Sequence, residues 1–166
     1  MTEVLKLGFS PCPNDTFMFH DLVHGLVKVE GVTFDHELLD IEALNRRSQE
    51  NPPPLDVTKL SIPALATSRH HYTLLSAGAA LGRGCGPLVV RAASREDLTS
   101  LADLSGARVA IPGRFTTAFM LFQMYGPSDI EVVEMRFDEI MPAVENGSVE
   151  AGLIIHESRF TYTDHG

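Results

Sequence analysis

The sequence predicts an α/β fold in which parallel strands form the sheets of two lobes. Short apolar runs alternate with segments whose apolar residues recur at helical spacing, which is the pattern of β-α units. This alternation occurs on both sides of a glycine-rich stretch, residues 78–87, which we take as the crossing between the lobes. The 166 residues are 44% hydrophobic and 21% charged, a composition typical of a globular chain with a sizeable core.

The first lobe is expected to comprise residues 1–87. Its strands are expected at residues 4–9, 32–38, 56–60 and 72–77, and its helices at residues 14–26, at residues 40–47 and after Ser61. Asn14 or Asp15 can cap the first helix, in which Leu22 and Leu26 share one face. Pro63 falls in the first turn of the last helix, where a missing N–H group does no harm.

The second lobe is expected to comprise residues 88–166. Its strands are expected at residues 87–92, 108–111, 130–136 and 151–155, and its helices at residues 96–104, 116–125 and 138–145. Gly106 closes the first of these helices, and Gly147 ends the last. In the middle helix Thr116 is the expected cap, and the side chains expected to pack inward are those of Ala118, Leu121, Phe122 and Tyr125.

Composition also restricts the partners and the compartment. The 13 basic and 22 acidic residues give a net charge of −9, which argues against a nucleic acid partner. No apolar run approaches the roughly 18 residues of a membrane span. Cys12 and Cys85 are too few and too far apart for a disulfide framework, and Glu3 and Lys6 interrupt any signal peptide, so we expect a cytoplasmic protein.

Three polar loops join a predicted strand to a predicted helix, at residues 10–16, 59–61 and 113–118. Such junctions leave unpaired N–H groups beyond the carboxyl ends of the strands, which suits an anion or a carbonyl group. In open α/β sheets ligands bind at these ends, so the three loops are candidates to line one crevice. The simpler alternative, ordinary helix capping, stays open for each loop.

Within these loops a few residue types suit a carboxylate ligand and a proton transfer. Lys59 is placed either to pair with an acid or to end a strand in solvent, and the N–H groups of Thr117 and Ala118 would face a carboxylate. His156 follows an apolar strand, and an imidazole can accept a proton near neutral pH. A capping histidine is the alternative for His156.

Other patterns do not support a metal or cofactor site. His20 and His24 have the spacing of a zinc-protease helix but lack its glutamate and a third ligand, so we expect surface histidines. The pair His70-His71 suits a helix end. The glycines of the 82–86 segment precede a strand rather than a helix, which excludes a dinucleotide fingerprint. We expect no metal and no cofactor.

Five segments, spread in order over the chain, resemble the 1,4-dihydroxy-6-naphthoate synthases of the futalosine route to menaquinone. They are residues 8–17 (GFSPCPNDTF), 58–61 (TKLS), 81–90 (LGRGCGPLVV), 112–118 (PGRFTTA) and 152–162 (GLIIHESRFTY). The resemblance implies a two-lobed, periplasmic-binding-protein-like (type II) α/β fold with mixed and parallel sheets. It also implies a lyase that converts cyclic dehypoxanthine futalosine, a small molecule carrying a carboxylate, to 1,4-dihydroxy-6-naphthoate.

The resemblance also assigns roles to residues of this chain. It implies that His156 is the general base and that Lys59, Leu60, Ser61, Thr117 and Ala118 contact the substrate. Further substrate contacts are expected from Ser10, Asn14 and Thr116.

Members of that family extend further at the C-terminus, so the first lobe is expected to be incomplete in this chain, which ends at Gly166. Two alternatives remain open. One is a non-catalytic, solute-binding type of small-molecule binder, and the other is the chorismate dehydratase of the same pathway.

Overall fold

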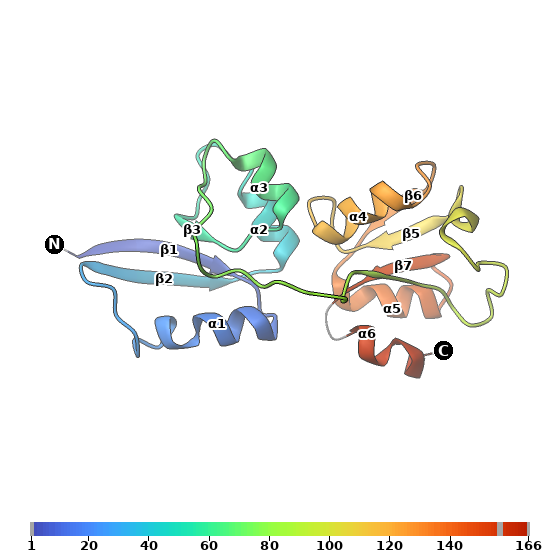
Figure 1. The fold of residues 1–166 in the computed structure, drawn as a ribbon, viewed down its shortest axis with the longest axis horizontal. Helices are drawn as coiled ribbons and strands as arrows, with labels where there is room; N and C mark the ends of the chain where they lie inside the picture. The colour runs from blue at the N-terminus through green and yellow to red at the C-terminus, as the bar shows by residue number, and fades with distance from the viewer. Residues whose placement is uncertain (1, 156–157, 166) are drawn as a thin grey trace. The chain divides into compact units, whose positions relative to one another are not determined.

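The protein is described by a computed structural model that covers residues 2–155 and 158–165. The chain divides into two compact units, Met1–Leu81 (unit 1) and Gly82–Gly166 (unit 2), and the division falls inside the glycine-rich stretch 78–87. Both units are α/β, as the sequence predicts (Figure 1).

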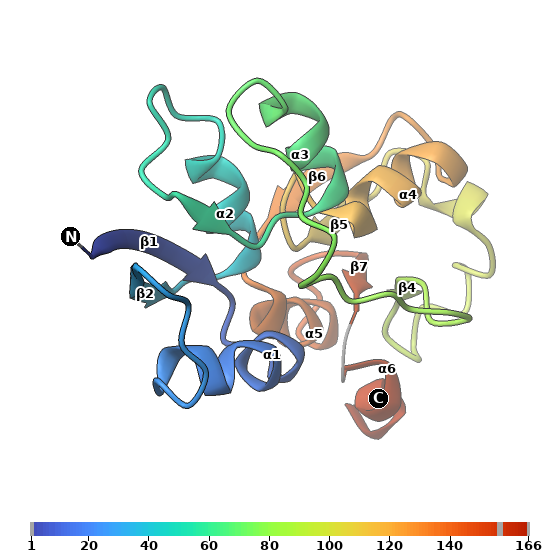
Figure 2. The same ribbon diagram turned by 60° about the vertical axis from the view of Figure 1, so that its left-hand side comes forward.

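Unit 1 contains a parallel sheet of three strands in the order β2-β1-β3. The strands are β1 (Glu3–Phe9), β2 (Val32–Leu38) and β3 (Val57–Thr58), and the helices are α1 (Pro13–Val23), α2 (Ile41–Arg47) and α3 (Ile62–Ser68). Helix α1 covers one face of the sheet, and α2 and α3 cover the other (Figures 1 and 2).

A helix cap and a closely packed glycine explain why the elements of unit 1 adopt this arrangement. Asp40 caps α2 by accepting a hydrogen bond from the Glu42 N–H at 2.9 Å, as its position in the sequence predicts. A Cβ atom at Gly8 would lie 2.6 Å from the side chain of Leu55 and 2.8 Å from that of Leu44. Glycine therefore allows α2 and the residues before β3 to pack closely on β1.

Some predictions for unit 1 are wrong. The N-cap of α1 is Cys12, not Asn14 or Asp15, because the Asp15 carboxylate turns back to Ser10 instead of capping the helix. The helix ends at Val23, before Leu26, which is 69% exposed.

The predicted strand at residues 72–77 is also absent, and the strand expected at residues 56–60 has only two residues, Val57 and Thr58. A strand needs a ladder partner and a buried face. Leu74 and Leu75 are 68% and 64% exposed, so the segment has no buried face. Among the described residues it also pairs with no strand.

Unit 2 contains a mixed sheet in the order β4-β7-β5-β6. Its strands are β4 (Leu88–Val90), β5 (Arg108–Ile111), β6 (Glu131–Glu134) and β7 (Ala151–Ile154). Its helices are η1 (Leu101–Leu104), α4 (Thr117–Tyr125), α5 (Phe137–Glu145), α6 (Ser158–Thr161) and η2 (Tyr162–His165), where η denotes a 3-10 helix. Strands β5, β6 and β7 are parallel, and β4 pairs antiparallel with β7.

Two hydrophobic clusters form the core of unit 2. Val109 and Ile111 of β5 belong to one cluster, together with Phe119 and Phe122 of α4. Ala110, between them, belongs to the other cluster with residues of α5, among them Ile140. Successive strand residues point to opposite faces, so β5 is buried on both faces, as a parallel strand between helix layers should be.

Two predictions for unit 2 need correction. The helix predicted at residues 96–104 is reduced to η1, where a capping box between Ser100 and Asp103 begins a single 3-10 turn. In α4 the buried residues are Ala118, Phe119 and Phe122, whereas Tyr125 is 72% exposed. The inward face of α4 is therefore rotated toward Phe119.

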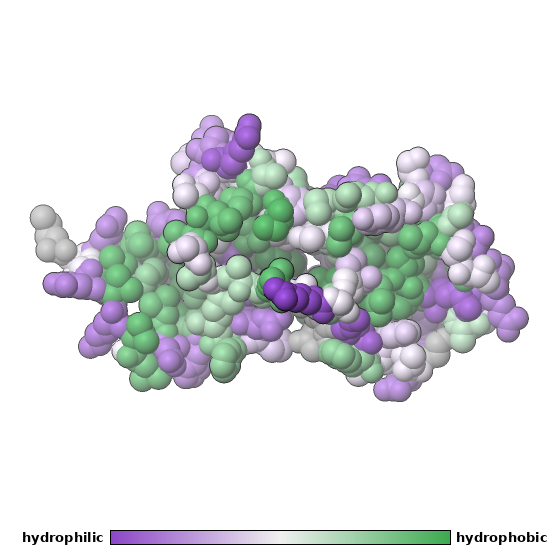
Figure 3. Space-filling view, viewed as in Figure 1, coloured by the Kyte–Doolittle hydropathy of each residue, from purple (hydrophilic) through white to green (hydrophobic). Residues whose placement is uncertain are grey.

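Hydrophobic residues also reach the surface of both units (Figure 3). Within residues 2–155 and 158–165, every helix is too short or too polar to cross a membrane.

Candidate functional site

The carboxyl edge of the sheet in unit 1 carries two of the predicted site loops. Because β1 and β3 are parallel, with Gly8 opposite Thr58, the chain leaves both strands at the same edge. The loop after β1 begins at Ser10, and the loop after β3 contains residues 59–61. The register between the strands is continued by a hydrogen bond of 2.9 Å from the Lys59 N–H to the carbonyl oxygen of Gly8.

A buried carboxylate connects these two loops. Asp15 is 5% exposed, and its Oδ2 accepts hydrogen bonds from the N–H of Ser10 at 3.1 Å and from the Ser10 hydroxyl at 2.8 Å. Its Oδ1 lies 3.4 Å from Nζ of Lys59, which also donates to the carbonyl oxygen of Gly78 at 2.8 Å. The acid with which Lys59 pairs in this structure is thus Asp15 of the same chain.

Ser61 is held by a second buried side chain, Asn45 of α2, which is 0% exposed. The Ser61 N–H donates to Asn45 Oδ1 at 2.9 Å, and Asn45 Nδ2 donates to the Ser61 hydroxyl at 3.1 Å. Ser61 is the N-cap residue of α3, as predicted, but its side chain makes no capping hydrogen bond. Leu60 is half-buried, and Asn14 is exposed on α1.

The carboxyl edge of the sheet in unit 2 carries the third loop. Strands β5 and β7 are parallel, with Ala110 opposite Gly152, so the loop after Ile111 and the chain after Ile154 leave at one edge. Ile155 is the last residue described before a gap at residues 156–157. His156, the predicted general base, lies outside the described residues.

Thr116 caps α4, as predicted. Its hydroxyl accepts a hydrogen bond from the Phe119 N–H at 3.2 Å and donates to the carbonyl oxygen of Gly113 at 2.7 Å. Gly113 has φ 146°, a backbone conformation that side chains rarely tolerate. The N–H groups of Thr117 and Ala118 have no acceptor within the helix and form its positive end. Thr116 and Ala118 are 2% and 3% exposed, so α4 offers a ligand backbone N–H groups rather than these side chains.

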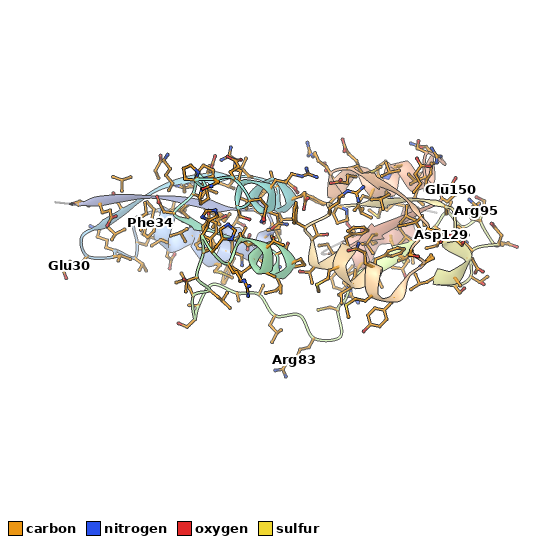
Figure 4. The ribbon with its side chains drawn as sticks, turned by 90° about the horizontal axis from the view of Figure 1, so that it is seen from above. Glu30, Phe34, Arg83, Arg95, Asp129 and Glu150 are labelled. Atoms are coloured by element: carbon orange, nitrogen blue, oxygen red, sulfur yellow. The ribbon has the colours of Figure 1, made fainter. Side chains whose placement is uncertain are left out.

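Ionisable groups outside the predicted site also have shifted pKa values, among them Tyr72 and Glu150. Burial, with the charges of Asp56 and Glu50, raises the pKa of Tyr72, whose hydroxyl donates to the carbonyl oxygen of Leu55 at 2.8 Å. In unit 2 the Arg108 N–H, at 2.7 Å, lowers the pKa of the Glu150 carboxyl. Glu150 precedes β7 and so lies at the opposite edge of the sheet from Thr116, in the same part of unit 2 as Arg95 and Asp129 (Figure 4).

The histidines of α1 are surface residues, as predicted. His20 and His24 are exposed, and their rings stack with centroids 4.3 Å apart. Among residues 2–155 and 158–165, no three His, Cys, Asp or Glu side chains are grouped to hold a metal ion. Arg83 of the glycine-rich stretch is exposed and extends from its loop into solvent (Figure 4).

Sequence reasoning predicts Lys59 and Ser61 as site residues but misses the two side chains that hold them, those of Asp15 and Asn45. Asp15 was considered only as a helix cap, and Asn45 was not considered. A short polar residue on the inward face of a predicted helix is a usable signal for Asn45, because buried polar groups need partners.

Comparisons with known proteins agree with this fold. A family model described as menaquinone biosynthesis matches residues 5–166. The chain is 53% identical over 164 residues to a 1,4-dihydroxy-6-naphtoate synthase of Thermus thermophilus. It is 44% identical over 170 residues to a protein of the same name in Streptomyces coelicolor. Each alignment covers 99% of this chain and 57% of the relative, so the chain spans little more than half the length of these relatives.

Solved structures give the same picture. A protein of Archaeoglobus fulgidus superposes with a TM-score of 0.85 at 40% identity, covering 98% of this chain and 58% of that one. Holo ArgBP of T. maritima superposes with a TM-score of 0.61 at 19% identity, covering 97% of this chain and 74% of that one. The second likeness concerns the fold alone and confirms the predicted binding-protein-like architecture. Because the family model matches residues 5–166, the chain belongs to the menaquinone biosynthesis family.

Proposed function

We propose that this chain carries the substrate-binding and catalytic residues of a 1,4-dihydroxy-6-naphthoate synthase, a carbon–carbon lyase of menaquinone biosynthesis. The relatives of that name in Thermus thermophilus and Streptomyces coelicolor support the proposal. The observation that carries it is the carboxyl edge of the sheet in unit 2. There the Thr116-capped N-terminus of α4 lies at the same edge as the end of β7, two residues before His156.

The proposed substrate is cyclic dehypoxanthine futalosine, whose carboxylate the N–H groups of Thr117 and Ala118 would bind. A helix N-terminus with two free N–H groups favours an anion. Lys59 supplies a positive charge, and Leu60 and Ser61 supply further contacts from the loop after β3. Asn14 is exposed and can reach a ligand directly, whereas Ser10 and Thr116 are 7% and 2% exposed and act by shaping their loops.

In the proposed reaction His156 accepts a proton from the substrate, and the electron pair left behind drives cleavage of a carbon–carbon bond. The cleavage releases a fragment derived from the sugar, and the remaining product gains an aromatic ring. No oxidant or reductant is consumed in this step. One positioned base contributes on the order of 10²- to 10⁴-fold to such a proton transfer.

The setting proposed for this reaction is the cytoplasm, and the proposed partner is a small-molecule substrate, with neither nucleic acid nor a membrane involved. The net charge of −9 is unsuited to a phosphate backbone, which supports the absence of nucleic acid from this proposal.

The activity is tested in two proteins, the 166-residue chain and a chimera in which this chain replaces the matching part of the Thermus thermophilus relative. Each is incubated with cyclic dehypoxanthine futalosine, and 1,4-dihydroxy-6-naphthoate is measured by mass spectrometry. Chorismate is offered in parallel. We expect the naphthoate product from at least the chimera. Turnover of chorismate, or binding without product, contradicts the proposal.

The role of the base is tested by His156→Ala, for which we expect kcat to fall by at least about 100-fold while substrate binding changes little. His24→Ala is the matched control, since His24 is exposed at the C-terminal end of α1. Its kcat should equal that of the unaltered protein. Retained turnover in the His156 variant removes this residue from the mechanism.

A further inference from the structure

Within the proposed function, on which this inference rests, the contacts of one further residue give it a role. We propose that Asp15 is a positioning residue that holds the Lys59 ammonium group at one point, from which it donates to an oxygen atom of the substrate.

The first support is that the Asp15 carboxylate is buried and fully engaged. It is 5% exposed, and both of its oxygens have partners: Oδ2 accepts two hydrogen bonds from Ser10, and Oδ1 faces Lys59 Nζ at 3.4 Å. A carboxylate engaged in this way is poorly placed to touch substrate. It acts on the site through the residues that it holds.

The second support is that Lys59 is held from two sides. Its side chain is 16% exposed, and its ammonium group donates to the carbonyl oxygen of Gly78 at 2.8 Å in addition to facing Asp15. An ammonium group has three N–H bonds. One of them is directed at the carbonyl oxygen of Gly78, and the charge of Asp15 lies beside the group, which leaves N–H capacity for a substrate oxygen. A long, flexible side chain is thereby restricted to one geometry before substrate arrives, which is the condition for efficient catalysis.

The third support is the location of Asp15 at the N-terminal end of α1, in the first turn after Cys12. The partial positive charge of a helix N-terminus stabilises a carboxylate. A carboxylate at this position fixes an ammonium group more firmly than a neutral amide does.

The test begins with Asp15→Asn, which keeps the acceptor for Ser10 but removes the charge that faces Lys59. Asp21→Asn is the matched control on the same helix, since the Asp21 side chain is 64% exposed and its partner is the neighbouring His20. In the active protein, either this chain or the chimera, we expect Asp15→Asn to lower kcat/KM by about 10- to 100-fold, chiefly through kcat. Asp21→Asn should leave it unchanged.

A double-mutant cycle with Lys59→Met separates positioning from a merely structural role. If Asp15 acts through Lys59, Asp15→Asn has no further effect on kcat/KM once Lys59 is Met. If Asp15 only stabilises the loop, the two losses multiply, and the inference is wrong. Asp15→Glu restores the charge and should recover part of the lost activity.

A measurement that does not depend on enzymatic turnover tests this inference independently of the proposed function. In the 166-residue chain, NMR of lysine ammonium groups should show one slowly exchanging signal that is lost in Lys59→Met and Asp15→Asn and kept in Asp21→Asn. A signal that persists in Asp15→Asn, or no protected signal in the unaltered chain, overturns the inference. Absence of turnover in all the proteins instead overturns the proposed function, and the NMR result still decides whether Asp15 holds Lys59.

Discussion

The two sheets carry their candidate site loops at the same kind of edge but hold them by different means. In unit 1 buried polar side chains hold the loops: Asp15 binds Ser10 and Lys59, and Asn45 binds Ser61. In unit 2 the loop after β5 ends at Thr116, and the helix that it begins is anchored by a hydrophobic cluster.

The hydrophobic residues of the two units differ in the same way. The described buried hydrophobic residues of unit 1 are Leu7, Phe9, Leu44, Leu55 and Ala64. Unit 2 has two clusters, one on each face of its sheet. Apolar burial stabilises at about 25 cal/mol per Å², whereas a hydrogen bond contributes only about 1 kcal/mol net but is expensive to leave half-made. The site loops of unit 1 should therefore be sensitive to lost polar partners, and those of unit 2 to lost apolar contacts.

The largest effect is expected from Phe119→Ala in unit 2. Phe119 is 4% exposed, and removing its ring leaves a cavity between α4 and β5, which should lower the free energy of unfolding of unit 2 by about 3–5 kcal/mol. Amide hydrogen exchange, followed at β5 and at β1, reports on the two units separately. Phe17→Ala is the control, because Phe17 is 87% exposed and its loss should change stability by less than about 0.5 kcal/mol. Equal acceleration of exchange at β1 and β5 would mean that the apolar cluster of unit 2 does not stabilise unit 2 separately from unit 1.

A smaller effect is expected from Asn45→Ala in unit 1. The change leaves the Ser61 N–H and the buried Glu42 without the amide group of Asn45, and should lower the free energy of unfolding of unit 1 by about 1–3 kcal/mol. Exchange should accelerate at β1 and not at β5. In a cycle with Ser61→Ala, the hydrogen bond between the two side chains predicts coupling of at least about 0.5 kcal/mol. Additive losses mean that Asn45 does not act through Ser61.

Much of the fold follows from sequence periodicity, and the errors have a common cause. The strand predicted at residues 108–111 is observed with the same bounds as β5 because Val109, Ala110 and Ile111 are buried between two helix layers and leave a strong signal. The segment at residues 72–77 has a similar apolar run but forms no strand. Whether an apolar run becomes a strand depends on a ladder partner elsewhere in the chain, and local patterns do not contain that information.

For the candidate site, the sequence predicts the loops but not the side-chain contacts that hold them. The loops that contain Lys59, Ser61 and Thr116 follow from local strand-to-helix junctions, and the structure places them at carboxyl edges. The contacts of Lys59 with Asp15 and of Ser61 with Asn45 depend on the alignment of β1 with β3 and on side-chain rotamers. Neither follows from spacing along the chain.

An alkaline titration should act on unit 1 through Tyr72. Its pKa is raised above the usual value of 10.0, chiefly by burial, so the folded chain favours the neutral hydroxyl. The stability that this provides is fully present below pH 10.0 and is lost as the pH rises through the raised pKa. The free energy of unfolding should therefore fall less steeply above this pH in Tyr72→Phe than in the unaltered chain. Tyr125→Phe is the control, since Tyr125 is 72% exposed. Equal slopes for the unaltered chain and Tyr72→Phe refute the assignment.

The smallest effect, at acid pH, is expected in unit 2 from Glu150, whose side chain is 29% exposed. The Arg108 N–H and then the Arg108 charge lower its pKa from 4.5, so its contribution to stability is present above pH 4.5 and is lost as the pH falls through the lowered pKa. Glu150→Gln keeps an acceptor for the Arg108 N–H but does not titrate. The unaltered chain should be the more stable at pH 7, and this advantage should shrink in acid, as measured by exchange at β5 and β7. An advantage that is independent of pH would mean that the carboxylate charge contributes nothing here, and that a neutral hydrogen bond is enough to join the start of β5 to that of β7.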